Sequence, residues 1–321
     1  MLAAQVMRTT GPDGVETREI DGPVGGPGQV LIDVHSVGVA FPDLLLSKGL
    51  YQLKPELPFT LGADLAGVVV ADAGEFRAGQ RVAAVMPYGG AATRVAVPLG
   101  SVFALPDSMS FDEGAALPMN YLTAEFVLQE RAGLRPGETV LVHGAAGGVG
   151  TATIQVAKAL GARTIAVTST EGKGLFAKAA GADDVVSLDG FKDAVLDLTG
   201  GRGVDVVVDV VGGDVFTDSL RALASQGRLM VVGFASGQGI PEVRVNRLLL
   251  NNVDVRGAGW GAHAMTHPGY FAEQWARLLP MIESGVVRPP IGATYDLADY
   301  ARALIDLDER RALGKLVVHV R

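Results

Sequence analysis

The chain has 321 residues, of which 48% are hydrophobic, so it is long enough for about two folded domains and does not have the composition of a disordered protein. Its 27 basic and 35 acidic residues give a net charge of −8 and no basic run is present, which argues against a nucleic-acid partner. Because the N-terminus lacks the order of a signal peptide and no uncharged apolar run approaches the ~18 residues of a membrane span, we expect a soluble, cytoplasmic protein with no membrane partner.

The first 120 residues are predicted to form a β-rich domain. Short apolar runs with many β-branched residues alternate there with Gly and Pro. These runs are residues 29–34, 67–71, 80–85 and 92–97. Turn signals at this spacing are typical of a compact, barrel-like β domain.

From about residue 121 the pattern changes to apolar strands that alternate with helices. The predicted strands are 139–143, 163–168, 184–187, 204–210 and 227–233. The predicted helices are 149–160, 171–180, 191–198 and 214–224. Strands that are apolar on both faces, each followed by a helix, are typical of a parallel doubly wound sheet.

Beyond about residue 255 the sequence becomes irregular again. It contains predicted helices at 268–284 and 297–309 and a final strand at 315–320. This segment is too small to be a comfortable domain, so we expect it to complete the first β domain. The predicted boundaries are therefore 1–120 and 257–321 for one discontinuous domain and 121–256 for a dinucleotide-binding domain inserted into it.

A glycine-rich loop between the first predicted strand of the middle domain and its helix carries the sharpest local signal. Ala145, Gly147 and Gly150 occupy the three small-residue places of a dinucleotide-binding turn. A side chain at Gly147 would collide with the phosphates, whereas a methyl group at the first place still fits the turn. Gly148, Val149 and Gly150 open the following helix, whose N–H groups and dipole attract the pyrophosphate.

The end of the second strand of the middle domain indicates which dinucleotide binds. An NAD site has a carboxylate about 20 residues after the glycines, but Ser169 stands 19 residues after Gly150. A hydroxyl does not repel a 2′-phosphate, and Lys173 can supply a positive charge to it. The sequence therefore favours NADPH. In the alternative interpretation Lys173 is a solvated lysine and Glu171 is the ribose ligand.

Ordered matches to one known family run through essentially the whole chain. They are Phe-Pro-Asp at 41–43, Gly-Leu-Tyr at 49–51, Leu-Pro-Phe at 57–59, the ten residues 115–124, the eight residues 135–142, the loop 144–150, Asp-Val-Val-Gly-Gly at 209–213, residues 233–237 and Gly-Lys-Leu-Val at 314–317. With these segments the chain resembles the medium-chain dehydrogenase/reductase superfamily, and within it the zinc-free quinone oxidoreductases related to zeta-crystallin.

The resemblance implies an α/β fold in which a Rossmann doubly wound parallel sheet is inserted in a GroES-like β-barrel catalytic domain. It also implies a cofactor cleft where the two domains meet, a small-molecule substrate and a homodimer. Carried onto this chain, the nicotinamide end would lie near Asp43, Thr123, Val210, Gly233, Phe234, Ala235 and Lys315. The adenosine end would use the loop 147–150, Ser169 and Lys173.

Two positions depart from the family pattern. Relatives often carry Asn at the place of Ala40, and alanine offers no hydrogen bond to the nicotinamide region. Relatives often carry Tyr at the place of Leu188, where the ring covers the adenosine. We therefore expect a site poor in hydrogen-bond donors and a somewhat lower cofactor affinity.

No metal is expected. The zinc-dependent relatives use Cys ligands and a Gly-His-Glu segment, whereas this chain has Gly62-Ala63-Asp64 and no Cys. We expect no two histidines to share a helix face and each to be a surface or core residue. The histidines are His35, His143, His263, His267 and His319.

Asp43, Tyr51 and Thr123 are the candidate catalytic residues. Asp43 follows a proline, where a carboxylate is more often a cap or turn residue than an acid. The loop around Tyr51 resembles the segment that places a Tyr at the active site of enoyl thioester reductases. The competing interpretation is that Tyr51 packs under its loop and makes one hydrogen bond.

The predicted function is NADPH-dependent reduction of quinones or small conjugated carbonyls by direct hydride transfer without metal. Two alternatives stay open. One is an enoyl thioester reductase of the 2-enoyl-CoA type. The other is a non-enzymatic NADPH-binding protein, of the kind that some zeta-crystallin relatives became.

Overall fold

The computed structural model describes residues 1–321, and these divide into two compact units. Unit 1 comprises residues 1–120, 268–275 and 289–321, and unit 2 comprises residues 121–267 and 276–288. The predicted fold class is confirmed, since both ends of the chain enter one β-rich unit and most of the residues between them form an α/β unit. The division differs in detail from the predicted boundaries, because residues 257–267 and 276–288 cluster with unit 2.

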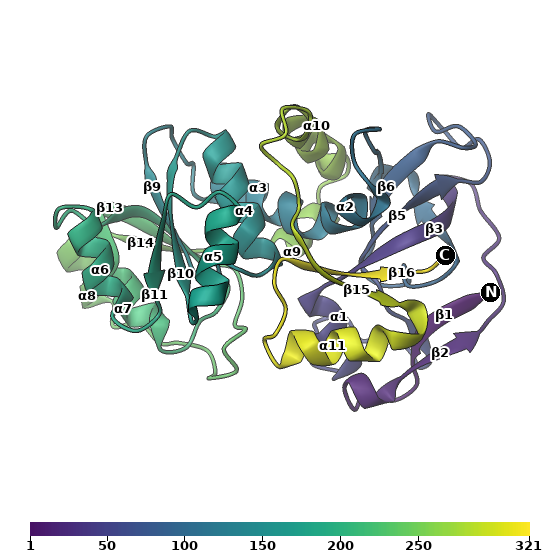
Figure 1. Cartoon of the computed structure of the whole chain (residues 1–321), viewed down its shortest axis with the longest axis horizontal. Coiled ribbons are helices and arrows are strands. Elements are labelled where there is room, and N and C mark those ends of the chain that lie inside the picture. Colours follow the sequence, from purple (N-terminus) through teal and green to yellow (C-terminus); the bar gives the residue numbers. More distant parts are fainter. The chain divides into compact units, whose positions relative to one another are not determined.

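Unit 1 is built on a seven-stranded sheet in which the two ends of the chain meet. Its strand order is β15-β16-β3-β5-β6-β8, with β7 paired to β3. The strands are β3 (Gln29–Val39), β5 (Asp64–Val69), β6 (Arg81–Val85), β7 (Arg94–Pro98), β8 (Val102–Ala104), β15 (Ile291–Asp296) and β16 (Lys315–His319). The C-terminal strand β16 lies antiparallel beside β3, which Figure 1 shows as a yellow ribbon next to a purple one. This pairing makes the unit discontinuous.

A smaller sheet and short helices complete unit 1. The sheet has the order β2-β1-β4, from β1 (Leu2–Val6), β2 (Val15–Glu19) and β4 (Phe59–Thr60). The α-helices are α1 (Phe41–Ser47), α2 (Phe111–Ala116) and α11 (Tyr300–Asp308), and the 3-10 turns are Pro12–Gly14, Leu99–Ser101 and Leu297–Asp299. Helix α2 starts where Ser110 and Glu113 cap each other's backbone N–H groups.

Unit 2 is a parallel doubly wound sheet of the order β11-β10-β9-β12-β13-β14. The strands are β9 (Thr139–Val142), β10 (Arg163–Thr168), β11 (Asp184–Ser187), β12 (Val204–Asp209), β13 (Leu223–Val231) and β14 (Asp254–Gly257). The helices between them are α4 (Gly148–Ala159), α5 (Glu171–Ala179), α6 (Phe191–Leu198), α7 (Val215–Ala222) and α8 (Asn246–Asn251). The strand order reverses between β9 and β12, and ligands of such sheets bind at the carboxyl ends of the strands at that point.

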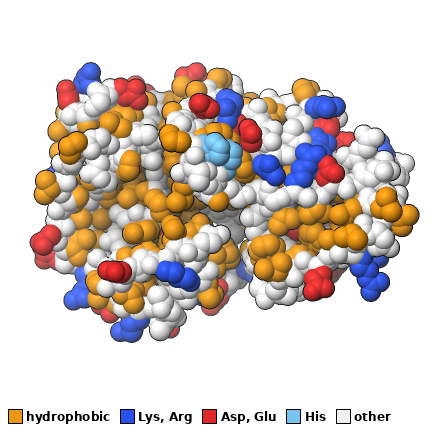
Figure 2. Space-filling model, turned by 180° about the vertical axis from the view of Figure 1, so that it is seen from behind, with side chains coloured by type: hydrophobic (Ala, Val, Ile, Leu, Met, Phe, Trp, Pro, Cys, Tyr) orange, Lys and Arg blue, Asp and Glu red, His pale blue; other side chains and the backbone are white.

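Further helices precede and follow the strands of this sheet in the chain. The segment before β9 contains two π-helical stretches, Pro118–Leu122 and Phe126–Arg131, on either side of α3 (Thr123–Glu125). Helices α9 (Trp260–Met265) and α10 (Tyr270–Glu283) follow β14. No helix of the chain is both long and apolar enough to cross a membrane. Acidic and basic side chains are interspersed with apolar ones over the face in Figure 2.

Candidate functional site

The loop between β9 and α4 lies at the point where the strand order reverses. Gly144 takes a φ of +61° to turn the chain, and the Gly147 N–H donates to the Gly144 carbonyl at 2.9 Å. A Cβ on Gly150 would lie 2.3 Å from the Gly144 oxygen, so only glycine lets α4 approach the turn. A Cβ on Gly147 would have no neighbour closer than 3.4 Å. The absence of crowding at Gly147 leaves room for an anion at the start of α4.

The loops after β12 and β13 bring together four of the residues predicted for the nicotinamide end. The Ala235 N–H donates to the Val210 carbonyl at 3.0 Å, so Val210 and the segment 233–235 lie side by side. Sequence reasoning missed Asp209, whose buried carboxylate accepts from the N–H groups of Val211 and Gly212 at 2.8 and 2.9 Å. Burial raises the pKa of this carboxyl, and the two N–H groups oppose that rise.

The residues predicted for the adenosine end follow β10. The Lys173 ammonium lies 3.5 Å from the Ser169 hydroxyl, and Thr170 caps α5 by accepting from the Lys173 N–H at 3.3 Å. A groove of about 600 Å³ is lined by Ser169, Thr170 and Glu171 among others. The carboxylate of the alternative interpretation, Glu171, therefore lines the same groove as Ser169. Leu188, where relatives often have Tyr, is partly exposed.

His143 is buried between the end of β9 and the glycine-rich loop that begins at Gly144. Its Nε2 lies 2.7 Å from the Ser219 hydroxyl, and its ring stands perpendicular to Phe191 at 4.9 Å between centroids. Because Ser219 donates its own proton to the Val215 carbonyl, it must accept from His143, which places the proton of the neutral imidazole on Nε2. Burial lowers the pKa of His143 to about 4.

This depressed pKa predicts that the chain loses stability as the pH falls from about 6.5 to about 4. In that window the unfolded chain binds a proton at His143 that the folded chain does not, so the free energy of unfolding drops by roughly 3 kcal/mol. His143→Gln, which can still donate to Ser219, should remove this slope. Urea unfolding of both proteins at pH 7.5 and 4.5 measures it.

The variant must be compared with the wild type because Asp43 changes the free energy of unfolding with pH in the opposite direction to His143. Burial raises the pKa of Asp43 to about 6, so its contribution to stability is present at low pH and is lost as the pH rises from about 4 to 6. Equal pH slopes for the wild type and His143→Gln would contradict the assignment to His143.

Asp43 is a fully buried carboxylate that joins two segments of unit 1. Its Oδ2 accepts from the Ala40 N–H at the start of α1, and its Oδ1 accepts from the Gly62 N–H, both at 2.9 Å. Both carboxylate oxygens therefore accept hydrogen bonds from backbone N–H groups of the protein. This geometry favours the structural interpretation of Asp43 over that of a catalytic acid.

Asp64 and Lys315 form a buried ion pair that sequence reasoning missed. The Lys315 ammonium lies 2.5 Å from Asp64 Oδ2, and Asp64 Oδ1 accepts from the Met119 N–H at 2.7 Å. The two side chains, lysine and aspartate, are 3% and 0% exposed. A Cβ on Gly38 would lie 2.4 Å from Lys315 Cε, so the glycine makes room for the lysine. The ammonium predicted to lie near the nicotinamide is thus held by Asp64.

Tyr51 and Thr123 lie in different units. Tyr51 packs half-buried against the core of unit 1, and its pKa is raised by burial and then by the negative charge of Asp43. Thr123 is nearly buried at the start of α3 in unit 2. Sequence reasoning also missed Tyr300, which is completely buried in unit 1 and whose pKa is raised by burial and by Asp43.

The residues present do not fit the zinc site of the dehydrogenases. Ala63 has no ligating atom, and the Asp64 carboxylate is occupied by Lys315 and the Met119 N–H. No three His, Asp or Glu side chains come together in an arrangement that could hold a metal ion.

Two of the histidines meet although they do not share a helix, because α9 ends at Met265 and His267 lies beyond its C-cap residue Thr266. His263 and His267 are four residues apart at the end of α9, and their rings stack at 3.9 Å between centroids. The turn after α9 brings the rings together, and His267 Nδ1 lies 2.7 Å from the His263 carbonyl oxygen.

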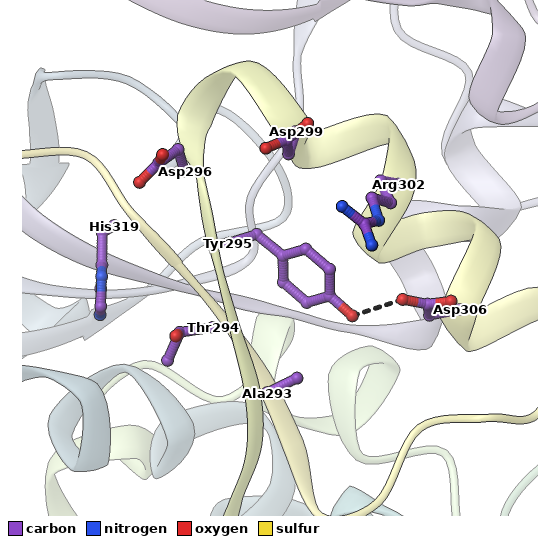
Figure 3. Close-up of a pocket in the computed structure, with 8 residues that line it drawn as sticks. All are labelled: Ala293, Thr294, Tyr295, Asp296, Asp299, Arg302, Asp306 and His319. Carbon is purple, nitrogen blue, oxygen red and sulfur yellow. Dashed lines mark hydrogen bonds between the residues drawn. The ribbon is translucent and has the colours of Figure 1, made fainter.

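A pocket of about 370 Å³ opens on unit 1 between β15 and α11 (Figure 3). Tyr295 donates to Asp306 Oδ2 at 2.5 Å inside it, and burial with the Asp306 carboxylate raises the pKa of Tyr295 to about 12. None of the residues predicted from the sequence for catalysis or cofactor binding lines this pocket.

Comparisons with known proteins agree with these features. The family models of an alcohol dehydrogenase GroES-like domain and of a zinc-binding dehydrogenase match residues 26–107 and 148–284. The chain is 38% identical over 302 residues to quinone oxidoreductase-like protein 2 of Rattus norvegicus, covering 92% of this chain and 86% of the relative.

Solved structures are similar over the full length. A probable oxidoreductase from Mycobacterium abscessus superposes with a TM-score of 0.91 at 42% identity, covering 100% of this chain and 99% of the other. The quinone oxidoreductase from Thermus thermophilus, which was also solved in complex with NADPH, superposes with a TM-score of 0.86 at 35% identity, covering both chains completely. The chain therefore belongs to the quinone oxidoreductase family of the medium-chain dehydrogenase/reductase superfamily.

Proposed function

We propose that this protein is an NADPH-dependent reductase of quinones or similar small conjugated carbonyls that works without metal. The observation that carries the proposal is the β9–α4 loop. It lies where the strand order reverses, its Gly150 is required for packing, and its Gly147 leaves room for a phosphate. The NADPH complex of the Thermus thermophilus relative supports the choice of dinucleotide.

Each part of the cofactor has a group of candidate residues in unit 2. The N–H groups of Gly148, Val149 and Gly150 at the start of α4 would hold the pyrophosphate, with Ala145 inside the turn. Ser169 and Lys173 would hold the 2′-phosphate. The paired loops with Val210, Gly233, Phe234 and Ala235 would receive the nicotinamide. NADPH supplies a hydride to the substrate when it is bound.

Substrates that delocalise charge suit this set of side chains. Hydride addition leaves a negative charge on the acceptor, which a zinc enzyme would stabilise with the metal. Ala40 offers no side-chain donor, and Asp43 and Lys315 already hold other protein groups. A quinone spreads the charge over its own ring, so it depends least on protein donors. We propose Tyr51 as the donor for substrates that form an enolate.

The choice of NADPH over NADH can be tested at Lys173. Removing a charge-assisted contact to the 2′-phosphate should weaken NADPH binding about ten- to a hundredfold in Lys173→Ala and leave NADH binding unchanged. Glu171→Gln is the matched variant in the same turn of α5. It should tighten NADPH binding, because a carboxylate leaves the groove that Ser169 lines. Fluorescence titration with both cofactors measures these effects. If Lys173→Ala changed only NADH binding, Glu171 would become the better ribose ligand.

The substrate class can be tested by measuring kcat/KM for a quinone, a small enone and an enoyl thioester on the wild type and Tyr51→Phe. We expect quinone reduction to survive the substitution, because the quinone needs no positioned proton donor. The enzyme is first dialysed against a chelator, which should leave activity unchanged. Activity that returns only with added zinc would contradict the metal-free mechanism.

The same experiment examines both alternatives. A thioester preferred by orders of magnitude, with turnover lost in Tyr51→Phe, would indicate an enoyl thioester reductase. NADPH binding without turnover of any of the three substrates would favour the non-enzymatic binding protein. The homodimer implied by the family is proposed as well, and sedimentation of the purified chain measures it.

A further inference from the structure

Two loops leave the sheet of unit 2 side by side at the carboxyl ends of β12 and β13. We name them the Val210 loop (residues 210–214) and the Gly233 loop (residues 232–238). The Ala235 N–H donates to the Val210 carbonyl at 3.0 Å, and the Ser236 N–H donates to the Val211 carbonyl at 2.9 Å. These bonds hold the two loops together beyond the last residues of the strands.

The glycine pair 212–213 makes this close approach possible. Both residues have a positive φ, +64° and +66°. A Cβ on Gly212 would lie 2.9 Å from Phe234 Cδ1, and a Cβ on Gly213 would lie 2.3 Å from Gln238 Oε1. A side chain at Gly212 would displace the Phe234 ring, and one at Gly213 would displace the Gln238 side chain from Asp214, while both would be strained at a positive φ.

A side-chain contact joins the far ends of the two loops. Asp214 is the N-cap residue of α7, where an aspartate usually accepts from N–H groups of its own helix. Here its carboxylate makes no such bond, and Oδ2 accepts instead from Gln238 Nε2 at 2.9 Å. The Asp214 N–H in turn donates to Gln238 Oε1 at 3.2 Å. The amide group of Gln238 therefore contacts Asp214 through two hydrogen bonds.

We propose that Asp214 and Gln238 are positioning residues that hold the Gly233 loop against the Val210 loop in the conformation that receives the nicotinamide end of the cofactor. Both side chains are exposed and act through the backbone of Val210, Gly233 and Ala235. Loops held in place before binding lose less conformational entropy when the ligand arrives. The inference rests on the proposed function, which assigns the nicotinamide end to these loops.

The test compares a ligand that reaches the loops with one that does not. In Gln238→Ala the Kd of NADPH should rise about three- to tenfold, as expected for the loss of exposed hydrogen bonds. The Kd of 2′,5′-ADP, which lacks the nicotinamide end, should be unchanged. Amide hydrogen exchange of Ala235 and Ser236 should become faster by a similar factor in the protein without cofactor, because their N–H groups bond across the two loops.

Exchanging the acceptor at Asp214 and the donor at Gln238 tests whether the hydrogen bond itself, and not any substitution at these positions, changes NADPH affinity. Gln238→Glu places two carboxylates against each other and should weaken NADPH binding. Asp214→Asn keeps both bonds and should bind normally. The double variant Asp214→Asn/Gln238→Glu restores one donor and one acceptor and should recover the affinity of the wild type.

Three results would overturn the inference. In Gln238→Ala these are an equal loss of affinity for NADPH and for 2′,5′-ADP, or unchanged NADPH affinity together with unchanged amide exchange. The third is a double variant that binds NADPH as weakly as Gln238→Glu alone. Failure of the wild type to bind NADPH would refute the proposed function instead. In that case amide exchange of Ala235 and Ser236 still tests the contact between Asp214 and Gln238. Faster exchange in Gln238→Ala than in the wild type would support its role in holding the loops, and unchanged exchange would refute it.

Discussion

Lys315→Met is expected to lower the free energy of unfolding by about 3–5 kcal/mol, the usual cost of leaving a buried charge without its partner. The Asp64 carboxylate is completely buried, and after the substitution its only remaining partner is the Met119 N–H. Urea unfolding at pH 7 measures the loss. Lys48→Met is the matched control, because Lys48 forms an exposed pair with Asp308 and should cost at most about 1 kcal/mol.

Two further measurements identify the uncompensated charge as the cause. Lys315→Met/Asp64→Asn should recover most of the stability, because no buried charge remains and the amide oxygen still accepts from Met119. The loss in Lys315→Met should also shrink at acidic pH. Burial already raises the pKa of Asp64, and without Lys315 the pKa rises further, so the variant regains stability as Asp64 is protonated. A loss that is independent of pH and persists in the double variant would point to packing instead.

Gly150→Ala and Gly147→Ala are expected to separate the two roles of glycine in the β9–α4 loop. The new methyl group of Gly150→Ala would lie 2.3 Å from the Gly144 oxygen and 2.7 Å from Ala145 Cα, both of them backbone atoms. This overlap costs about 1–3 kcal/mol and outweighs the roughly 0.5–1 kcal/mol that alanine usually contributes within a helix. Thermal unfolding without cofactor should therefore show a lower Tm for Gly150→Ala.

Gly147→Ala should leave the Tm unchanged, since its methyl group would meet nothing closer than 3.4 Å. Its effect should instead be at least a tenfold weaker affinity for NADPH, because the methyl group enters the space left for the phosphates. Gly172→Ala in the first turn of α5, where a Cβ would meet no atom within 4 Å, is the control for both measurements. A normal NADPH affinity in Gly147→Ala would show that the pyrophosphate binds elsewhere.

Elements with a strong local pattern were predicted from the sequence with accurate bounds. The strands 163–168 and 184–187 and the helix 191–198 agree with β10, β11 and α6 residue for residue, since a polar residue at or directly after the last position marks the end of each. The short strands were missed. Strand β2, for example, is Val15-Glu16-Thr17-Arg18-Glu19, which buries little and is stabilised by its pairing with β1. Its position therefore depends on a partner rather than on its own residues.

The sequence by itself determined the family, the doubly wound sheet and the glycine-rich loop, because each depends on residues within one turn or one βα unit. Only the tertiary structure decided which polar residues are paired. Asp64 and Lys315 are 251 residues apart, and Asp214 and Gln238 are 24 apart on different loops. No local periodicity encodes such contacts, because they arise when strand pairing brings distant segments together. Strand β16 beside β3 places Lys315 near Gly38, and the parallel pairing of β12 with β13 aligns the two loops.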